Sequence, residues 1–422
     1  MFKRGDTLKN VLKCATIFSL IVFFLLSCAP TSRETKENKE ALTFTDISDG
    51  LPREGLWRQN IALADMSGGG FLDIIAPPPR KAEKDKLRPF IFSWSTGEGK
   101  WTEGRFRFPE IRDYSYAGIA VGDINRDGAP DIVLANHTGR IILLLNNKQG
   151  GFVESPFPMK EGFSSRTVEI ADVNGDGWPD VIAFSEGPFQ SRYKPEGILV
   201  GINKDGKGWD VKVVEGGTDV YGDSMAVGDL RGTGLKDVIV APETTIQTLK
   251  KSIWFGDGKG NFNSYEGDLF PDKVTIAVRA GDADGDGKDV AVFRLAGADS
   301  AGTARQSLAA LKWTGEGFAD ISEGLEAIEY PYVFDFADLY GDGKKQLVVL
   351  SDSGIGLYRH GPGGWVNIGF QRLSPDDTRG AYSLRAGRNR DGSLLIVYNQ
   401  GTSYAELKKG IRAFKVTLSG GK

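Results

Sequence analysis

The fold is decided by two stretches of the chain, DINRDGAPDIVLA at residues 123–135 and DVNGDGWPDVIAF at residues 172–184. In each stretch an aspartate opens a short loop that contains glycine, and a second aspartate closes it. A run of apolar, partly β-branched residues follows directly. Asp, Asn and Gly favour tight turns, and short β-branched runs between turn signals favour strands. Each stretch therefore predicts a tight loop that leads into a buried β-strand.

The same design recurs along the chain. Six stretches carry it clearly, and a seventh, RAGRNRDGSLLIVYN from Arg385, is degenerate. The position that opens the loop recurs at intervals of 49 to 58 residues, a period that suits a four-stranded propeller blade. The seven opening positions are Asp65, Asp123, Asp172, Asp229, Asp282, Asp338 and Arg388.

The two ends of the chain predict how such a ring would close. Residues 42–52, LTFTDISDGLP, resemble the fourth-strand segment FADISEGL at residues 318–325 but precede the first repeat. Residues 411–418, IRAFKVTL, resemble a third strand with no fourth strand after it. Pairing the two ends would complete one blade and remove exposed sheet edges. We therefore expect an all-β, seven-bladed β-propeller of four-stranded antiparallel blades over residues 42–422, closed by the N- and C-terminal strands in one blade.

The N-terminus has the features of an export signal. Basic residues precede Cys14–Leu26, an apolar run of 13 residues, which is short for a membrane span but suits a signal peptide. The run ends in LLSC at residues 25–28, which resembles a lipoprotein signal box. This resemblance implies a signal peptide over residues 1–27, a lipid on Cys28 and, with alanine as the next residue, attachment to the outer membrane. An ordinary signal peptide or a short membrane anchor is the alternative.

Residues 28–41 are expected to form a flexible tether, because APTSRETKENKEA is polar and has no aromatic residue to bury. The formal charge of the chain is −4, and loss of the basic signal would make the remainder more acidic. We therefore expect no nucleic-acid partner. The chain has 2 cysteines, of which one would be removed and the other lipidated, so no disulfide framework is expected.

The loops predict bound calcium. Oxygen-bearing side chains at loop positions 1, 3, 5 and 9, with a backbone carbonyl at position 7, can converge on one hard cation. Six loops have glycine at position 6, where we expect a positive φ. Asx turns without a metal are the alternative. The predicted calcium ligands, loop by loop, are Asp123, Asn125, Asp127 and Asp131; Asp172, Asn174, Asp176 and Asp180; Asp282, Asp284, Asp286 and Asp289; and Asp338 and Asp342.

The loop sequences DINRDGAPD and DVNGDGWPD, with NNKQGGF at residues 146–152, resemble FG-GAP or VCBS repeats, as found in the propellers of integrin α-subunits. The resemblance covers roughly residues 42–418. It implies a propeller with calcium-binding loops, except in the seventh loop, where Arg388 departs from the pattern. Function is left open by this resemblance, because the family includes adhesion domains, lectins and non-catalytic modules of enzymes.

Aromatic residues between the blades predict a binding surface on the face opposite the calcium loops. Trp57, Tyr221 and Tyr330 each lie eight residues before the opening position of their blade, so they should lie at similar radius and height. Aromatic platforms beside polar groups suit a sugar or a peptide, whereas packing between blades is the alternative. The candidate ligand-binding residues are Trp57, Arg58, Tyr114, Tyr116, Arg166, Tyr221, Tyr330, Tyr332 and Arg379.

Sequence signals of catalysis are weak. His137 and His360 are lone loop histidines, and the chain has no nucleophile elbow, phosphate loop or zinc spacing. We therefore expect a non-catalytic, calcium-stabilised binding or adhesion module for a glycan or protein ligand, exported and held at a membrane by its lipid. A carbohydrate-active enzyme, such as a polysaccharide lyase, and a structural scaffold in an envelope complex are the alternatives.

Overall fold

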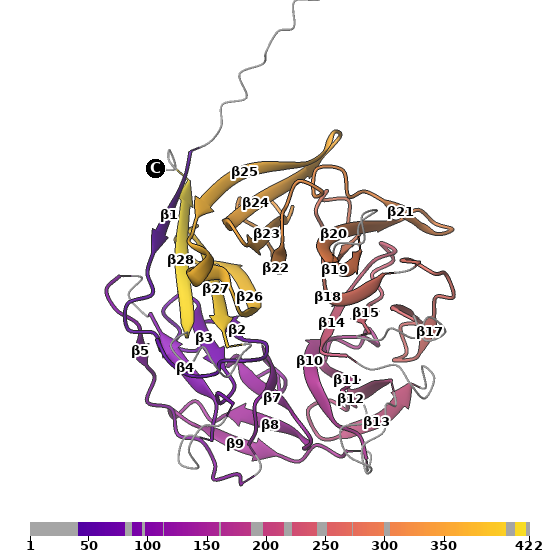
Figure 1. The fold of residues 1–422 in the computed structure, drawn as a ribbon. Helices are drawn as coiled ribbons and strands as arrows, with labels where there is room; N and C mark the ends of the chain where they lie inside the picture. The colour runs from indigo at the N-terminus through magenta and orange to yellow at the C-terminus, as the bar shows by residue number, and fades with distance from the viewer. Residues whose placement is uncertain are drawn as a thin grey trace, which may run out of the picture. The chain divides into compact units, whose positions relative to one another are not determined.

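In a computed structural model of the chain, the described residues form seven sheets, each of four antiparallel strands. Successive strands pair within each sheet, and the sheets are arranged around a ring (Figure 1). The first strands of neighbouring blades are in contact all the way round, so these strands line the axis and the ring is closed. The predicted all-β, seven-bladed propeller is confirmed.

The strands of the first four blades have the following bounds. Blade 1 contains β2 (Ala62–Ala64), β3 (Asp73–Ala76), β4 (Phe90–Ser93) and β5 (Thr102–Glu103). Blade 2 contains β6 (Ala117–Gly122), β7 (Asp131–Asn136), β8 (Ile141–Asn146) and β9 (Phe152–Ser155). Blade 3 contains β10 (Ser165–Ala171), β11 (Asp180–Ser185), β12 (Ile198–Asn203) and β13 (Trp209–Val214). Blade 4 contains β14 (Ser224–Gly228), β15 (Asp237–Ala241), β16 (Ile253–Gly256) and β17 (Phe262–Ser264).

The last three blades follow the same plan. Blade 5 contains β18 (Val274–Gly281), β19 (Val290–Ala298), β20 (Ala304–Trp313) and β21 (Phe318–Asp320). Blade 6 contains β22 (Pro331–Ala337), β23 (Gln346–Ser351), β24 (Gly354–Gly361) and β25 (Gly364–Arg372), and the short helix α1 (Pro375–Thr378) follows it. Blade 7 contains β26 (Ala381–Arg388), β27 (Leu394–Gln400), β28 (Ile411–Leu418) and β1 (Leu42–Asp46).

The structure describes most of the chain after the predicted signal and tether. The predicted lipidation site Cys28 and the predicted ligand residue Tyr221 lie outside the described residues, as do residues 1–40. No helix among the described residues is long and apolar enough to cross a membrane. The described ranges are 41–80, 87–94, 98–112, 114–159, 162–186, 197–214, 222–242, 251–271, 273–298, 304–401 and 410–418.

The second strand of each blade accounts for the unbroken apolar runs in the sequence. Strand β7 is buried along its whole length because both of its faces are covered. Ile132 and Leu134 pack against blade 1, whereas Val133 and Ala135 pack against blade 3. Clusters of this kind fill all seven interfaces between neighbouring blades. Since a fully buried large aliphatic side chain contributes about 1.5–3 kcal/mol, these interfaces supply the main driving force for the ring.

Blade 7 closes the ring with strands from both ends of the chain. Strand β1 pairs antiparallel with β28, so that Leu42 lies opposite Leu418 and Asp46 opposite Phe414. The backbone amide of Ile47 extends this pairing with a 2.9 Å bond to the Ala413 carbonyl. The prediction that the two terminal segments share one blade is therefore confirmed.

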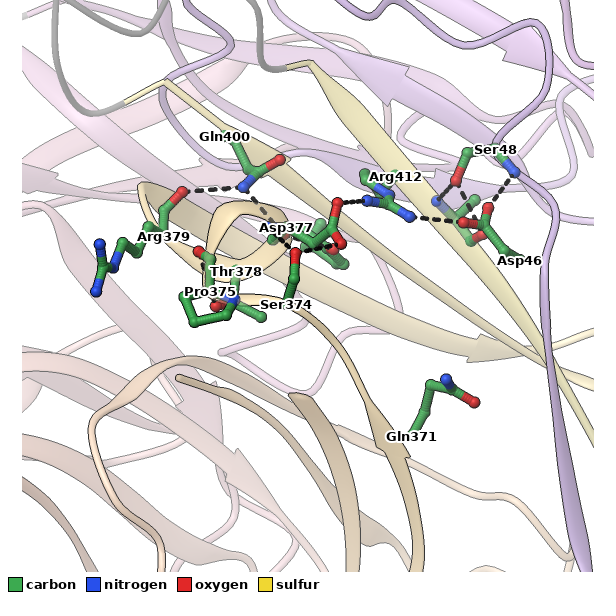
Figure 2. Close-up of polar contacts among 12 residues, drawn as sticks. Asp46, Ser48, Gln371, Ser374, Pro375, Asp377, Thr378, Arg379, Gln400 and Arg412 are labelled. Carbon is green, nitrogen blue, oxygen red and sulfur yellow. Dashed lines mark hydrogen bonds and ion pairs between the residues drawn. The ribbon is translucent and has the colours of Figure 1, made fainter. Parts of the chain in front are cut away.

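Polar contacts reinforce this closure (Figure 2). Arg412 on β28 pairs with Asp46 on β1 at 2.6 Å, and its other terminal nitrogen pairs with Asp377 on α1. The backbone carbonyl of Asp377 accepts hydrogen bonds from the Tyr398 hydroxyl at 2.8 Å and from the Gln400 amide at 3.0 Å. The link between blades 6 and 7 is thus tied to both strands that close the ring.

Candidate functional site

The loops after the first strands are organised by the aspartate at position 1. Asp123 accepts the backbone amides of Asp127 at 2.9 Å and of Gly128 at 2.8 Å, one on each carboxylate oxygen. The two bonds reach four and five residues along the chain, so a single carboxylate closes the whole loop. The expected positive φ at loop position 6 is confirmed in all six loops. This backbone conformation allows the tight turn that the aspartate closes. The six glycines and their φ values are Gly70 (83°), Gly128 (87°), Gly177 (84°), Gly234 (80°), Gly287 (81°) and Gly343 (88°).

The aspartate at position 9 lies behind the loop, in the core. Asp131 is fully buried. Its two oxygens accept the amide of Ile124 at 2.9 Å and that of Asn146 at 2.7 Å. It thereby ties the loop to the end of the third strand. Asp180 does the same in blade 3, and burial raises the pKa of each carboxyl to about 6, against the amide bonds that favour the charged form.

In blades 2 and 3 the side-chain oxygens at positions 1, 3 and 5 converge at the exposed edge of the loop. The oxygens of Asp123 and Asn125 both lie within 3.1 Å of the Asp127 amide. The Asn125 side-chain amide in turn donates to the Asp127 carboxylate at 3.3 Å. In blade 3, Asn174 donates to Asp176 at 2.8 Å in the same way. This donor set of carboxylate and carboxamide oxygens fits calcium, which takes six to eight oxygen ligands.

The loop of blade 5 has the same acidic character but different partners. Lys312 on β20 pairs with both Asp284 and Asp286, the latter at 2.8 Å. His360 on β24 of the neighbouring blade contacts the other oxygen of Asp284 at 2.5 Å. Burial alone would raise the pKa of Asp284, but the hydrogen bonds from Lys312 and His360 outweigh it and lower the pKa. The cation of this loop is supplied by the protein.

The last aspartate of that loop points away from it. Asp289 accepts the backbone amide of Asp229, in the loop of blade 4, at 2.8 Å. One residue is missing before it, so Val290 takes the place in the sheet that Asp131 has in blade 2: Val290 lies opposite Gly281, as Asp131 lies opposite Gly122. Because side chains alternate between the faces of a strand, a shift of one residue turns the carboxylate to the other side. Asp289 is therefore separated from Asp284 and Asp286, with which it was predicted to form one ligand set.

Blade 4 also carries its own cation. Arg231, at position 3, pairs with the fully buried Asp237 at 2.8 Å and donates to the Gly256 carbonyl at 2.6 Å. Burial raises the pKa of Asp237, and the guanidinium opposes that rise. In blade 6, Asp338 wraps its loop as Asp123 does, and Asp342 accepts the Lys344 amide at 3.0 Å. Across the described residues, no three His, Cys, Asp or Glu side chains are grouped as a metal site.

The opposite face carries a polar network at the ring axis, which we call the axial cluster. Its residues lie at or near the ends of strands that face away from the loops. The Tyr382 hydroxyl of blade 7 donates to Asp223, just before blade 4, at 2.9 Å. Since these two blades are not neighbours, the contact spans the axis. The axial cluster consists of Arg58, Tyr116, His137, Arg166, Glu186, Asp223 and Tyr382.

Arg166 is the centre of this cluster. Its guanidinium pairs with Asp223 at 2.9 Å and with Glu186 at 2.8 Å, and its side chain is only 10% exposed. Glu186 also contacts His137 Nδ1 at 2.6 Å and accepts the Thr138 amide at 2.7 Å. Burial opposes ionisation of Glu186, but these hydrogen bonds outweigh it, so its pKa is lowered. The carboxylate is therefore held charged.

Aromatic rings and further cations border the cluster. The Tyr116 ring lies 4.8 Å from that of His137, and the Arg80 guanidinium lies 4.9 Å from the Tyr116 centroid. Arg58 lies over Tyr382 at 5.2 Å. Cations over aromatic faces are a common element of binding surfaces for polar ligands. Among the predicted ligand residues, Arg58, Tyr116 and Arg166 are thus brought together.

The other described ligand candidates are not members of the axial cluster. Trp57 is 5% exposed and packs edge-on against Phe90, and Tyr114 is buried in the interface of blades 1 and 2. Tyr330 is 50% exposed with a φ of 47°. Tyr332 donates to Asp352 at 3.2 Å. Figure 2 shows the Arg379 side chain pointing away from the closure contacts, while its carbonyl accepts from Gln400. Trp57 and Tyr330 do not form one patch.

The sequence interpretation missed His137 and Glu186. His137 was interpreted as a lone loop histidine, but it pairs with a carboxylate 49 residues further along the chain. One signal was available: both residues directly follow the second strand of their blade, at equivalent ends of neighbouring blades. Residues that follow the second strands of neighbouring blades lie side by side, so a histidine and a glutamate at these positions predict a contact.

Comparison with known proteins agrees with the loop geometry. Residues 123–183, which include both complete loops, match the model of the FG-GAP-like repeat family. The chain carries an FG-GAP-like repeat. The match starts at the loop of blade 2 and ends within the second strand of blade 3. The matched repeat thus contains the aspartate-rich loops of blades 2 and 3 and reaches into the buried second strand that follows each loop.

Solved structures resemble the chain in fold. A fungal alcohol oxidase of the AA5 family, in complex with copper, is 11% identical over 90% of this chain and 77% of that chain, with a TM-score of 0.54. The α-L-arabinanase of Penicillium chrysogenum complexed with arabinobiose is 12% identical over 74% of this chain and 96% of its own, with a TM-score of 0.45. The soluble aldose sugar dehydrogenase of Escherichia coli is 11% identical over 90% and 100%, with a TM-score of 0.39. At these identities the likeness concerns the fold alone.

Proposed function

We propose that this protein is a non-catalytic binding module, stabilised by calcium in blades 2 and 3, that takes a glycan or protein ligand at the axial cluster. The observation that carries the proposal is the concentration of charged and aromatic groups at one end of the axis. Arg58 and Arg80 lie over the rings of Tyr382 and Tyr116 there, and the Arg166 guanidinium pairs with Asp223 beside them. Binding sites commonly combine aromatic surface with a few oriented polar groups.

Calcium has a structural role in this proposal. Asp123, Asn125 and Asp127 would hold one ion, and Asp172, Asn174 and Asp176 a second, together with backbone carbonyls. A cation there would offset the repulsion of the loop carboxylates and add stability to the folded state by mass action. The buried Asp131 and Asp180 would support the two loops from behind through their amide contacts.

Membrane attachment through a lipid on Cys28 completes the proposal. Changing Cys28→Ser should release the exported protein from the membrane fraction and leave its precursor uncleaved. Cys14→Ser serves as the control, because that residue lies in the segment expected to be removed. If Cys28→Ser partitions with membranes as the unchanged protein does, the lipid anchor is wrong.

The binding role is tested with two matched arginines. Arg58 over Tyr382 and Arg126 over Trp178 both have their guanidinium 5.2 Å from the ring centroid, the first at the axis and the second on the loop face. In a glycan array followed by titration with the best-bound glycan, Arg58→Gln should weaken binding at least tenfold. Arg126→Gln should leave it unchanged. Equal effects of the two changes would show that the ligand does not bind at the axis.

The alternative, a polysaccharide lyase, predicts a reaction product instead of binding alone. A lyase would release unsaturated products from uronic-acid polysaccharides, and the pair formed by His137 and Glu186 would have to supply its base. We expect no such product from the unchanged protein. Product formation that disappears in His137→Gln would replace the binding proposal by catalysis.

A further inference from the structure

A cavity of about 150 Å³ opens beside the axial cluster, between blades 4 and 7. At about 30 Å³ for each water molecule, it has room for roughly five waters or for one small polar ligand. Its walls come from blades 4, 5, 6 and 7 and from the segment before blade 1. The polar residues that line it are Asn60, Asp223, Ser224, Arg279, Arg294, Tyr332 and Tyr382.

The charged groups on the wall leave the cavity positive. Arg279 and Arg294 are guanidinium groups, and Asp223 is the one carboxylate among the described lining residues. Asp223 already accepts hydrogen bonds from Arg166 at 2.9 Å and from Tyr382 at 2.9 Å. The charge of Asp223 is therefore shared with Arg166, which is not part of the cavity wall, and the two arginines outnumber the single carboxylate on that wall.

Arg279 is incompletely satisfied by the protein. Its Nε atom is buried, forms no hydrogen bond among the described residues, and lies 3.7 Å from the nearest carboxylate oxygen, on Asp335. One terminal nitrogen donates to the Val278 carbonyl at 2.8 Å, and the other makes a long 3.4 Å contact with Asn60. Burial and the nearby Arg385 lower the pKa of Arg279 to about 10, against the charges of Asp335 and Glu169, which raise it. A guanidinium has five N–H donors in a planar fork, which suits a carboxylate.

We propose that this cavity binds a small hydroxylated carboxylate, of which sugar acids are the representative class. The ligand carboxylate pairs with Arg279, and its hydroxyl groups contact Asn60 and Asp223. This inference rests on the proposed binding function, because it names the kind of ligand group that enters at the axis. An acidic group at the end of a glycan would meet the same requirement as the free sugar acid.

The test compares D-glucuronate with D-glucose, which have the same ring but differ in the carboxylate. Isothermal titration calorimetry of the purified full chain should give at least tenfold tighter binding of glucuronate. Arg279→Gln should abolish this difference, because glutamine retains hydrogen-bond donors but has no charge. Arg88→Gln is the control, since Arg88 pairs with Glu103 in blade 1 and should leave both affinities unchanged.

A second variant and the affinities of the unchanged protein test the cavity further. If Arg279→Gln does not fold, Asn60→Asp places a negative charge on the same wall and should weaken glucuronate binding at least tenfold. Equal affinity of the unchanged protein for both sugars overturns the carboxylate inference alone, provided that glycan binding still depends on Arg58. Absence of binding to both sugars and to every glycan of the array overturns the inference and the proposed function together.

Discussion

The loops of blades 2 and 5 are almost interchangeable as sequences, DINRDGAPD and DADGDGKD, yet their carboxylates have different partners. In blade 2 the oxygens of Asp123, Asn125 and Asp127 converge with one another at the exposed edge. In blade 5 an ammonium group from the third strand, Lys312, lies between two aspartates. In blade 5 the chain itself thus provides a cation for the acidic loop.

A single register position on the third strand separates the two cases. Lys312 directly precedes Trp313, which pairs with Phe318 on the fourth strand. The corresponding residues in blades 2 and 3 are Leu145 and Ile202, which precede Asn146 and Asn203 in the equivalent pairs. Neither aliphatic side chain can neutralise the loop. A loop motif thus has to be interpreted together with the third strand of its own blade.

The largest expected effect concerns the internal cation of blade 4. Changing Arg231→Leu leaves the fully buried Asp237 without its partner, and breaking a buried pair on one side costs about 3–5 kcal/mol. The free energy of unfolding in urea should fall by that amount whether calcium is present or not. Arg126→Leu, on an exposed loop position, should change it by less than about 0.5 kcal/mol. A loss below about 1 kcal/mol for Arg231→Leu would contradict the role of Arg231 as a resident cation.

Loss of one calcium site should have the next largest effect. At a calcium concentration 100 times the dissociation constant, each site adds about 2.7 kcal/mol to stability. Asp123→Asn and Asp172→Asn keep an oxygen for the loop amides but remove a charge, so each should remove one bound ion, as measured by equilibrium dialysis. Asp282→Asn should leave the stoichiometry unchanged. A loss of one ion in Asp282→Asn would show that blade 5 binds calcium despite Lys312.

Removing the ammonium group of Lys312 should make the loop of blade 5 behave like that of blade 2. Without calcium, Lys312→Met should destabilise the fold by about 1 kcal/mol, because Asp284 and Asp286 lose a partly exposed partner. With calcium the loss should be recovered, and one additional ion should bind. Lys148→Met, at an exposed pair with Asp127, is the matched control and should do neither. If the Lys312 variant gains no ion, the missing register position at Asp289 is sufficient to prevent binding.

The smallest expected loss of stability comes from replacing the glycine at loop position 6, and it should be equal in blades 2 and 5. Gly128 and Gly287 have φ values of 87° and 81°, and an added Cβ at either position would meet no atom within 4 Å. Alanine in each should therefore cost only the strain of a left-handed backbone, about 1 kcal/mol. Thermal unfolding of Gly128→Ala and Gly287→Ala in the presence of a chelator should give equal losses. A clear difference would mean that the two loops differ in backbone as well as in charge.

The architecture could be predicted because it depends on patterns that repeat along the chain. The opening aspartates marked the ends of the first strands, and the unpaired segments at 42–52 and 411–418 marked the shared blade. Both signals are local in sequence and depend only on alternation, turns and period. They required no knowledge of which side chains meet.

The functional residues were harder to predict because their partners come from other blades. Lys312 and His360 reach Asp284 from two different strands, 28 and 76 residues away. Repeat equivalence also placed Trp57 and Tyr330 at the same radius, although one packs in the core and the other is half exposed. The apolar residues around each side chain decide whether it is buried or exposed, and many of these residues come from the neighbouring blade.

The shared blade has a consequence for the order of folding. Strand β1 is among the first parts of the propeller to be synthesised, but its partner β28 is the last of the described strands of the propeller. Their contact between Asp46 and Arg412 joins residues 366 positions apart. Contacts between such distant residues form slowly, since a long loop must close before the pairing stabilises it. Until β28 has been synthesised, β1 therefore has an unpaired edge that can associate with other chains.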